Sequence, residues 1–209
     1  MTTRLPAEER KAAVLDSACG VFATGSYRGT TTAEIAKKAG VTEPILYRHF
    51  ASKRELYLAV LDESWRRLRQ LWEATIEREE DPRFWLGALG RAYFEEKDPR
   101  LLSADLWIQA LTEATDDPEI RKFLRKHMRE VHAFVTDVIR RSQAAGGILP
   151  DRDPEAEAWI FIAIGLIGTV GRRVGGLFED DFPRIIAERR RWMTGAEEPS
   201  HIEDQFPVP

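Results

Sequence analysis

Apolar residues recur every three or four positions along most of this chain, which is the period of a helix that buries one face. The repeat is clear between Leu56 and Trp72 and again between Ile120 and Val138. No stretch alternates apolar and polar residues as a half-buried strand does. The pattern therefore predicts an all-α protein.

Four aspartate–proline pairs mark expected helix starts. An aspartate before a helix can accept hydrogen bonds from the free amides of the first turn, and proline fits the first helical position. The alternative is a plain turn, but ten or more residues of helical pattern follow each pair. The pairs are Asp81-Pro82, Asp98-Pro99, Asp117-Pro118 and Asp153-Pro154.

Glycines at Gly40, Gly146-Gly147 and Gly175-Gly176 follow periodic segments, and glycine is common just past a helix end. These starts and ends predict about nine helices. We expect them near residues 7–24, 32–39, 43–49, 53–79, 82–97, 99–114, 118–145, 154–174 and 183–194. Residues 1–52 form the first expected domain and residues 53–195 a larger helical one, followed by an acidic, proline-containing tail at 196–209.

The first domain contains two short expected helices joined by a tight turn. Thr31 and Glu34 have the spacing of a capping box, which starts one helix. Gly40 ends that helix, and Thr42 can cap the next one. Two short helices with a glycine-containing turn of about three residues form a helix-turn-helix. The second helix could then read the major groove of DNA. The alternative is a helical corner within a bundle.

Charge is distributed unevenly along the chain. Residues up to Val60 include nine basic and six acidic residues, whereas the remainder includes 22 basic and 29 acidic residues. A mildly basic front on an acidic body fits a chain whose first segment meets a polyanion.

The cysteine content and the length of the apolar runs indicate where the protein is located. Cys19 is the only cysteine, so no internal disulfide is expected, and a reducing cytoplasm is the default location. The longest apolar run, Ala158 to Gly171, has 14 residues, short of the roughly 20 that cross a bilayer. We therefore expect no contact with a membrane.

The run from Gly25 to Ala36, together with Ala39 to Thr42 and Leu46 to Phe50, resembles the DNA-binding domain of the TetR family of transcriptional regulators. The resemblance covers roughly residues 10 to 58. It implies a homodimeric, effector-responsive regulator, usually a repressor, that places two recognition helices on double-stranded DNA at a palindromic operator. Carried over by position, the resemblance gives ten DNA-binding candidates. These are Arg28, Thr31, Thr32, Thr42, Glu43, Pro44, Ile45, Tyr47, His49 and Lys53.

Two positions depart from the family pattern. Ser26 adds a residue between Gly25 and Tyr27, so Arg28 can sit differently from its family counterpart. Glu43 is an acid on a helix expected to face DNA. It can accept a hydrogen bond from cytosine, or it can face solvent and repel phosphate, and we favour the second role.

Glycines repeat every third residue in the apolar segment after Asp153. Each glycine inside a helix costs about 1 kcal/mol relative to alanine, so three of them suggest the close approach of another backbone. We expect this helix to form a dimer interface with the helix near 183–194, the alternative being burial within one subunit. The expected interface residues are Ile164, Gly165, Gly168 and Gly171.

Aromatic residues are frequent in the body of the chain. They are commonly core residues, but they also line apolar ligand pockets. His127 lies on an apolar stripe, where it is either a satisfied core histidine or part of a pocket wall. We expect an apolar or aromatic small-molecule effector to touch some of Trp85, Tyr93, Trp107, Phe123 and His127.

No catalytic motif supports an enzyme. The sequence has no glycine-rich nucleotide loop, no GxSxG and no HExxH, and we expect no cofactor or metal. His127 and His132 are five residues apart, about 140° around a helix, so they cannot share one metal. The remaining alternative is a DNA-binding protein without an effector, either an activator or an architectural scaffold.

Overall fold

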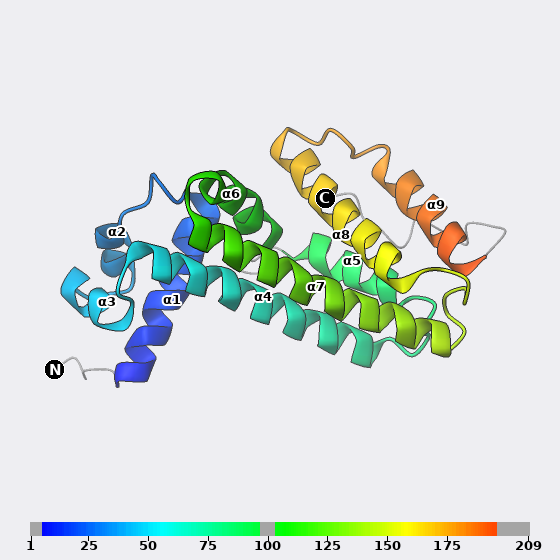
Figure 1. Cartoon of the computed structure of the whole chain (residues 1–209), viewed down its shortest axis with the longest axis horizontal. Helices are drawn as coiled ribbons and strands as arrows, with labels where there is room; N and C mark the ends of the chain where they lie inside the picture. The colour runs from blue at the N-terminus through cyan, green and yellow to red at the C-terminus, as the bar shows by residue number, and fades with distance from the viewer. Residues whose placement is uncertain (1–5, 97–102, 196–209) are drawn as a thin grey trace. The chain divides into compact units, whose positions relative to one another are not determined.

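The computed structural model describes residues 6–96 and 103–195, and these residues form helices joined by turns, with no strand among them (Figure 1). The all-α prediction is confirmed. The described helices are α1 (Ala7–Thr24), α2 (Thr32–Lys38), α3 (Glu43–His49), α4 (Lys53–Arg78), α5 (Trp85–Glu95), α6 (Ser103–Asp116), α7 (Pro118–Ala144), α8 (Pro154–Arg173) and α9 (Phe182–Thr194).

Two of the four aspartate–proline pairs start helices as predicted. Asp117 accepts hydrogen bonds from two amides in the first turn of α7, and Asp153 does the same for α8. The prediction for Asp81-Pro82 is wrong. Asp81 accepts from the amide and guanidinium of Arg83 and forms a turn, so α5 begins only at Trp85. The pair Asp98-Pro99 lies outside the described residues.

The chain divides into two compact units. The first comprises residues 1–68 and 97–127, and the second comprises residues 69–96 and 128–209. This division differs from the expected boundary between residues 52 and 53. The reason is that α6 and the first turns of α4 and α7 contribute buried residues to the same core as α1, α2 and α3.

The core of the first unit is continuous from the short helices to α6. Phe22 of α1, Ile35 of α2 and Leu46 of α3 are fully buried together with Tyr57 of α4 and Leu106 of α6. The hydroxyl of Tyr57 donates to the carbonyl of Leu106 at 3.3 Å. Each fully buried apolar side chain of this size contributes about 1.5–3 kcal/mol. The short helices are therefore held by shared packing rather than by their own length.

Cys19 lies in this core and is fully buried. Burial raises the pKa of its thiol to about 11, because a thiolate loses hydration there. The thiol is therefore protonated at neutral pH, and Cys19 acts as a small apolar core residue.

The core of the second unit is built around tryptophan and phenylalanine. The indole N–H of Trp72 donates to the carbonyl of Leu89 at 3.0 Å, and its ring lies 5.8 Å from Phe134 and 6.0 Å from Phe161. These contacts join the end of α4 to α5, α7 and α8. Gly147 closes the turn after α7, where an added Cβ would lie 2.6 Å from the backbone of Pro82.

Helix α8 is longer than the uninterrupted apolar run in the sequence. It has 20 residues, and its most apolar 18-residue window has a mean hydropathy of 1.3, which by length and composition would suffice to cross a membrane. Core helices of soluble proteins pass the same test. Only 28% of its most apolar window is buried, so the described residues leave much of its apolar surface uncovered.

Candidate nucleic-acid interface

Helix α2 is fixed at its start by the predicted capping box. The hydroxyl of Thr31 accepts from the amide of Glu34 at 3.2 Å, and the Glu34 carboxylate accepts from the amide of Thr31 at 2.8 Å. These bonds hold the pKa of Glu34 below its usual range. Thr31 is exposed at this helix start, where free backbone amides favour an anion such as phosphate.

The turn between α2 and α3 depends on Gly40. Its φ of +67° is a left-handed conformation that a side chain would strain. Thr42 then precedes α3, but its side chain makes no capping hydrogen bond, so that part of the prediction is wrong. The carbonyl of Thr42 accepts from Ile45 and Leu46 instead. The hydroxyl of Thr42 therefore remains on the exposed surface.

Helix α3 has one buried and one exposed face. Leu46 is fully buried, and Phe50 directly after the helix is 3% exposed, so both anchor α3 to the core. The exposed residues are Thr42, Pro44, Tyr47 and Arg48, while Glu43, Ile45 and His49 are half-buried. The outward face thus carries hydroxyl, aromatic and cationic groups, which are suited to base edges and phosphates.

Thr32 and Glu43 do not have the positions expected for surface groups. Thr32 is buried, and its hydroxyl donates to the carboxylate of Glu43 and lies 3.1 Å from the Tyr47 hydroxyl. These contacts tie α2 to α3. The role we favoured for Glu43, facing solvent and repelling phosphate, is therefore corrected: its carboxylate is occupied within the protein, and Thr32 links the two helices.

Arg28 also has partners within the first unit. Its guanidinium bonds the carboxylates of Glu113 at 3.0 Å and Asp116 at 2.9 Å, both on α6. Arg54, near the start of α4, pairs with Asp117 at 3.1 Å. Desolvation opposes ionisation of Asp117, but its bonds to Arg54 and to two backbone amides keep its pKa below the usual value.

Lys53 is positioned by an aromatic ring at the first residue of α4. Its ammonium group lies 4.7 Å from the centre of the Tyr27 ring, and it is half-buried. Partial burial lowers its pKa, although the carboxylates of Glu113 and Glu34 oppose this shift. A cation at a helix start is well placed to meet phosphate.

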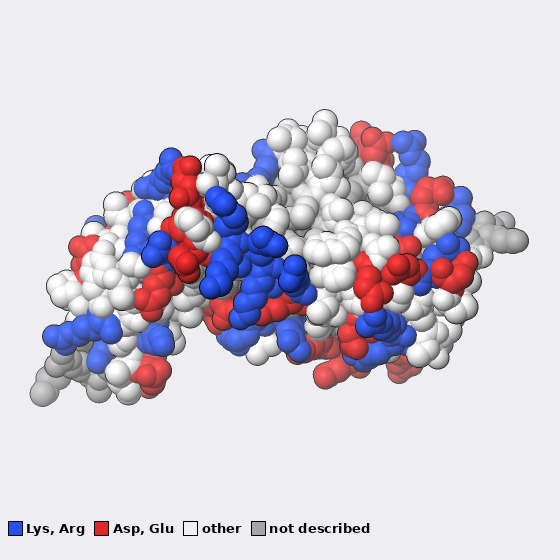
Figure 2. Space-filling model, viewed as in Figure 1, with Lys and Arg blue, Asp and Glu red and all other residues white. Residues whose placement is uncertain are grey.

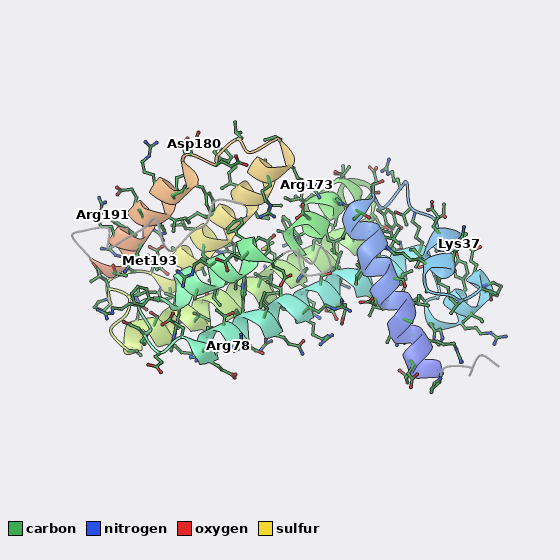
Figure 3. All side chains as sticks on the ribbon, turned by 180° about the vertical axis from the view of Figure 1, so that it is seen from behind. Lys37, Arg78, Arg173, Asp180, Arg191 and Met193 are labelled. Atoms are coloured by element: carbon green, nitrogen blue, oxygen red, sulfur yellow. The ribbon has the colours of Figure 1, made fainter. Side chains whose placement is uncertain are left out.

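Three exposed cations were missed by the sequence analysis. Arg48 lies on the exposed face of α3, and Lys37 and Lys38 are exposed on α2. Figure 3 labels Lys37. A basic residue inside the expected recognition helix was a signal for Arg48. The signal for the two lysines was their position in the last turn of the helix that precedes it, because lysine is a common phosphate contact.

The five expected effector residues divide between the two units. In the first unit, His127 is 4% exposed and its ring lies 5.7 Å from Phe123 and 6.1 Å from Trp65. Trp107 is half-buried against the same core, and its indole nitrogen has no hydrogen-bond partner among the described residues. Trp65 is the aromatic neighbour that the sequence analysis missed.

In the second unit, Tyr93 is 5% exposed and its hydroxyl lies 3.2 Å from that of Thr169. The indole of Trp85 donates to the carbonyl of Glu79, and Arg141 lies over its ring. The structure therefore gives Tyr93 and Trp85 local packing roles.

Two of the expected interface glycines are buried within this chain. An added Cβ on Gly168 would lie 2.7 Å from the ring of Phe94, and one on Gly171 would lie 2.8 Å from Phe178. The expected approach of another backbone is corrected for these two positions, because aromatic side chains fill the space. Gly165 has nothing within 4 Å, and Ile164 is half-buried, so both remain candidates.

Helices α8 and α9 expose large apolar side chains. Trp159, Ile160, Ile167 and Val170 are exposed along one stripe of α8, and exposed Val174 directly follows the helix. Figure 2 shows a broad uncharged surface over α8. On α9, Ile185 and Trp192 are 39% and 54% exposed. We call these seven residues the apolar stripe. An uncovered surface of this kind typically marks an interaction site.

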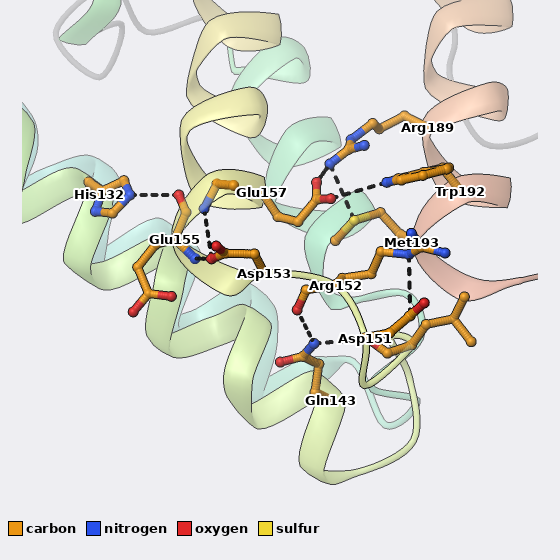
Figure 4. A network of polar contacts seen from close by, with 12 residues as sticks. His132, Gln143, Asp151, Arg152, Asp153, Glu155, Glu157, Arg189, Trp192 and Met193 are labelled. Carbon is orange, nitrogen blue, oxygen red and sulfur yellow. Dashed lines mark hydrogen bonds and ion pairs between the residues drawn. The ribbon is translucent and has the colours of Figure 1, made fainter.

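A polar network fixes the end of α9 against the start of α8 (Figure 4). Buried Glu157 pairs with Arg189 and accepts from the indole of Trp192 at 3.1 Å. The guanidinium of Arg152 lies 3.8 Å from the Trp192 ring. The network therefore orients an exposed member of the apolar stripe. Among the described residues, no group of histidine, cysteine or acidic side chains is arranged to hold a metal.

The sequence matches two family models in succession. Residues 14–60 match the model described as bacterial regulatory proteins, tetR family, and residues 82–165 match the model described as BetI-type transcriptional repressor, C-terminal. The first match covers the helices of the candidate interface, and the second covers α5, α6, α7 and the first half of α8.

Individual proteins show similarity over different lengths. The chain is 31% identical to the probable regulator ArpR of Pseudomonas putida over 174 residues, 79% of this chain and 82% of ArpR. It is 52% identical to the activator FasR of Mycolicibacterium smegmatis, but over 58 residues, 28% of this chain and 26% of FasR. A regulator from Saccharomonospora viridis, solved with choline, shares the fold with a TM-score of 0.69 at 22% identity, covering 80% of this chain and 87% of that one.

Proposed function

Because the chain belongs to the TetR family of transcriptional regulators, we propose that it represses transcription from a palindromic operator and leaves that operator when it binds a small molecule. The family assignment makes it a DNA-binding transcriptional regulator. Members of this family are not enzymes. The proposal adds the sign of regulation, the symmetry of the operator and the response to an effector, and it places the protein in the cytoplasm.

The exposed face of α3 is the observation that carries the proposal. Leu46 and Phe50 anchor the helix from one side, while Thr42, Tyr47 and Arg48 remain exposed on the other. A short helix supported in this way can enter the major groove without losing its packing. We assign Thr42 and Pro44 to base contacts, and Arg48 and Lys53 to phosphate contacts, with Thr31, Ile45, Tyr47 and His49 at the edges of the interface.

We propose a homodimer that pairs two such interfaces. The apolar stripe on α8 and α9 supports this step, because one chain leaves these side chains in water. A two-fold contact would place the same stripe of each copy against the other. Gly165 and Ile164 lie on α8 and are candidates for the edge of the contact.

We propose that the effector has an apolar or aromatic part that contacts Trp107, Phe123 and His127 in the first unit. Aromatic rings also attract organic cations, so choline, the molecule bound by the Saccharomonospora viridis regulator, belongs in a first ligand screen. Trp85 and Tyr93 of the second unit remain weaker candidates because both have partners within the protein.

Two substitutions test how the interface divides its contacts. Lys53→Ala should weaken binding to every duplex and reduce the salt slope by about one, because one phosphate contact is lost. Thr42→Ala should leave the salt slope unchanged and relax the preference at one base position. Operator sequences are first selected from a random duplex pool, and affinities are then measured across a salt series.

The outcome of this test separates two kinds of contact. If both variants changed affinity and salt slope equally, the division between base and phosphate contacts would be wrong. Binding of wild-type protein to duplexes with no sequence preference would favour an architectural scaffold. The local similarity to an activator makes activation the second candidate, and transcription from the selected operator in a purified system distinguishes the two signs.

A further inference from the structure

A set of five ion-paired residues joins the loop before α2 and the start of α4 to the end of α6 and to Asp117 directly after it, all within the first unit. Arg28 lies between α1 and α2 and bonds both Glu113 and Asp116, while Arg54 on α4 bonds Asp117. We call these five residues the clasp. Arg28 and Glu113 are separated by 85 residues in sequence, so the clasp links segments that only the fold brings together.

The loop that carries Arg28 is internally fixed. The amide of Gly29 donates to the Ser26 hydroxyl at 3.0 Å, and the amide of Thr30 donates to the Ser26 carbonyl at 3.0 Å. Ser26 is one of the two positions that depart from the expected family pattern. Its two contacts turn the loop and hold Arg28 in place next to the two carboxylates of α6.

Two of the three acidic partners, Glu113 and Asp117, are also anchored, whereas the Asp116 side chain is exposed. The Glu113 side chain is 12% exposed, unlike a freely solvated surface acid. Asp117 accepts from the amides of Glu119 and Ile120 in addition to Arg54. Fixed partners lose less conformational freedom when they form an ion pair, so such pairs can orient a neighbouring segment more effectively than mobile ones.

We propose that Arg28 and Arg54 are positioning residues that hold the helix-turn-helix in its operator-binding orientation through Glu113, Asp116 and Asp117. Arg28 then acts through the acids of α6 and makes no contact with phosphate. This inference rests on the proposed operator binding. Because the pairs are at the surface, they are screened by salt, and the clasp weakens as ionic strength rises.

Charge reversal separates positioning from phosphate contact. Arg28→Glu faces two acids and should weaken operator affinity about threefold to tenfold, the range expected for loss of exposed pairs. The double variant Glu113→Lys with Asp116→Lys should weaken it similarly. Combining all three substitutions restores opposite charges and should return affinity to within about twofold of wild type.

A phosphate contact gives a different pattern. If Arg28 touched DNA directly, Arg28→Glu would stay weak in the triple variant and would lower the salt slope, which would overturn the proposal. Equal affinity in all variants would overturn it too. The matched control is the exposed pair of Asp181, directly before α9, and Arg184 on α9, where Asp181→Lys with Arg184→Glu should leave operator affinity unchanged.

A second measurement needs no operator. Hydrogen exchange of the amides at residues 26–30 should accelerate in Arg28→Glu and return to the wild-type rate in the triple variant, because the loop loses and regains its partners. Unchanged exchange in every variant would count against the clasp. If exchange followed this pattern but the wild type bound no duplex, the clasp would stand and the proposed function would fail.

Discussion

The first unit and the second unit expose opposite kinds of surface. In the first, α3 buries Leu46 and presents hydroxyl, phenol and guanidinium groups to water. In the second, α8 and α9 leave the apolar stripe uncovered. The first surface can remain solvated until DNA arrives, whereas the second is stable only if something apolar covers it. The comparison suggests that assembly precedes operator binding.

The largest expected effect is on assembly. The double variant Ile167→Asp with Val174→Asp places two charges on the apolar stripe, and burying them against a second copy would be unfavourable. The protein should become a monomer, and operator affinity should fall about a hundredfold or more because two linked half-sites bind far better than one. Sedimentation and operator titration measure the two effects.

A conservative change provides the control for this variant. Ile167→Leu keeps the apolar area and should leave both mass and affinity unchanged. A dimer that persists in the charged variant would show that the apolar stripe is not the contact between copies, and the assignment of α8 and α9 to assembly would then fail.

The next prediction contrasts substitutions on the buried and the exposed face of α3. Leu46→Ala removes a fully buried side chain and should destabilise the first unit by about 2–5 kcal/mol. Arg48→Ala, on the exposed face of the same helix, should change stability by less than about 0.5 kcal/mol but should weaken operator binding. Reactivity of Cys19 reports opening of this unit, because its thiol is buried with a pKa of about 11.

The two outcomes are distinguishable because stability and binding respond to different faces. Labelling of Cys19 should be faster in Leu46→Ala and unchanged in Arg48→Ala. Equal labelling rates would contradict the packing role of Leu46. Full operator affinity in Arg48→Ala would remove this residue from the interface.

The sequence correctly predicted the structural features that depend on residues close together in the chain. The capping box at Thr31 and Glu34, the turn at Gly40 and the helix starts at Asp117 and Asp153 follow from local hydrogen bonding and backbone conformation. Family resemblance located the exposed face of α3. These features require no knowledge of how distant segments pack.

The features that sequence analysis missed depend on long-range contacts. The partner of Glu43 is Thr32 on another helix, and the partners of Arg28 lie on α6. No spacing rule connects such positions. The helix start expected at Asp81 failed because Arg83 competes for its carboxylate. We expected one effector to touch some of the five aromatic candidates, and the fold distributes these candidates between two units.

The smallest effect concerns the glycines of α8. Gly168→Ala would place a Cβ 2.7 Å from the Phe94 ring, so it should destabilise the second unit by about 1–3 kcal/mol. Gly165→Ala meets nothing within 4 Å and should stabilise the helix by up to about 1 kcal/mol. Urea unfolding measures both changes.

The sign of the Gly165 effect also tests the dimer. If stability rises and the mass stays that of a dimer, Gly165 lies beside the contact between copies rather than within it. If Gly165→Ala weakens the dimer but stabilises the monomeric variant Ile167→Asp with Val174→Asp, a side chain or backbone of the second copy must pack against Gly165. If Gly168→Ala left the free energy of unfolding unchanged, Phe94 could move aside at no cost. Close packing of Phe94 would then not explain the glycine at this position.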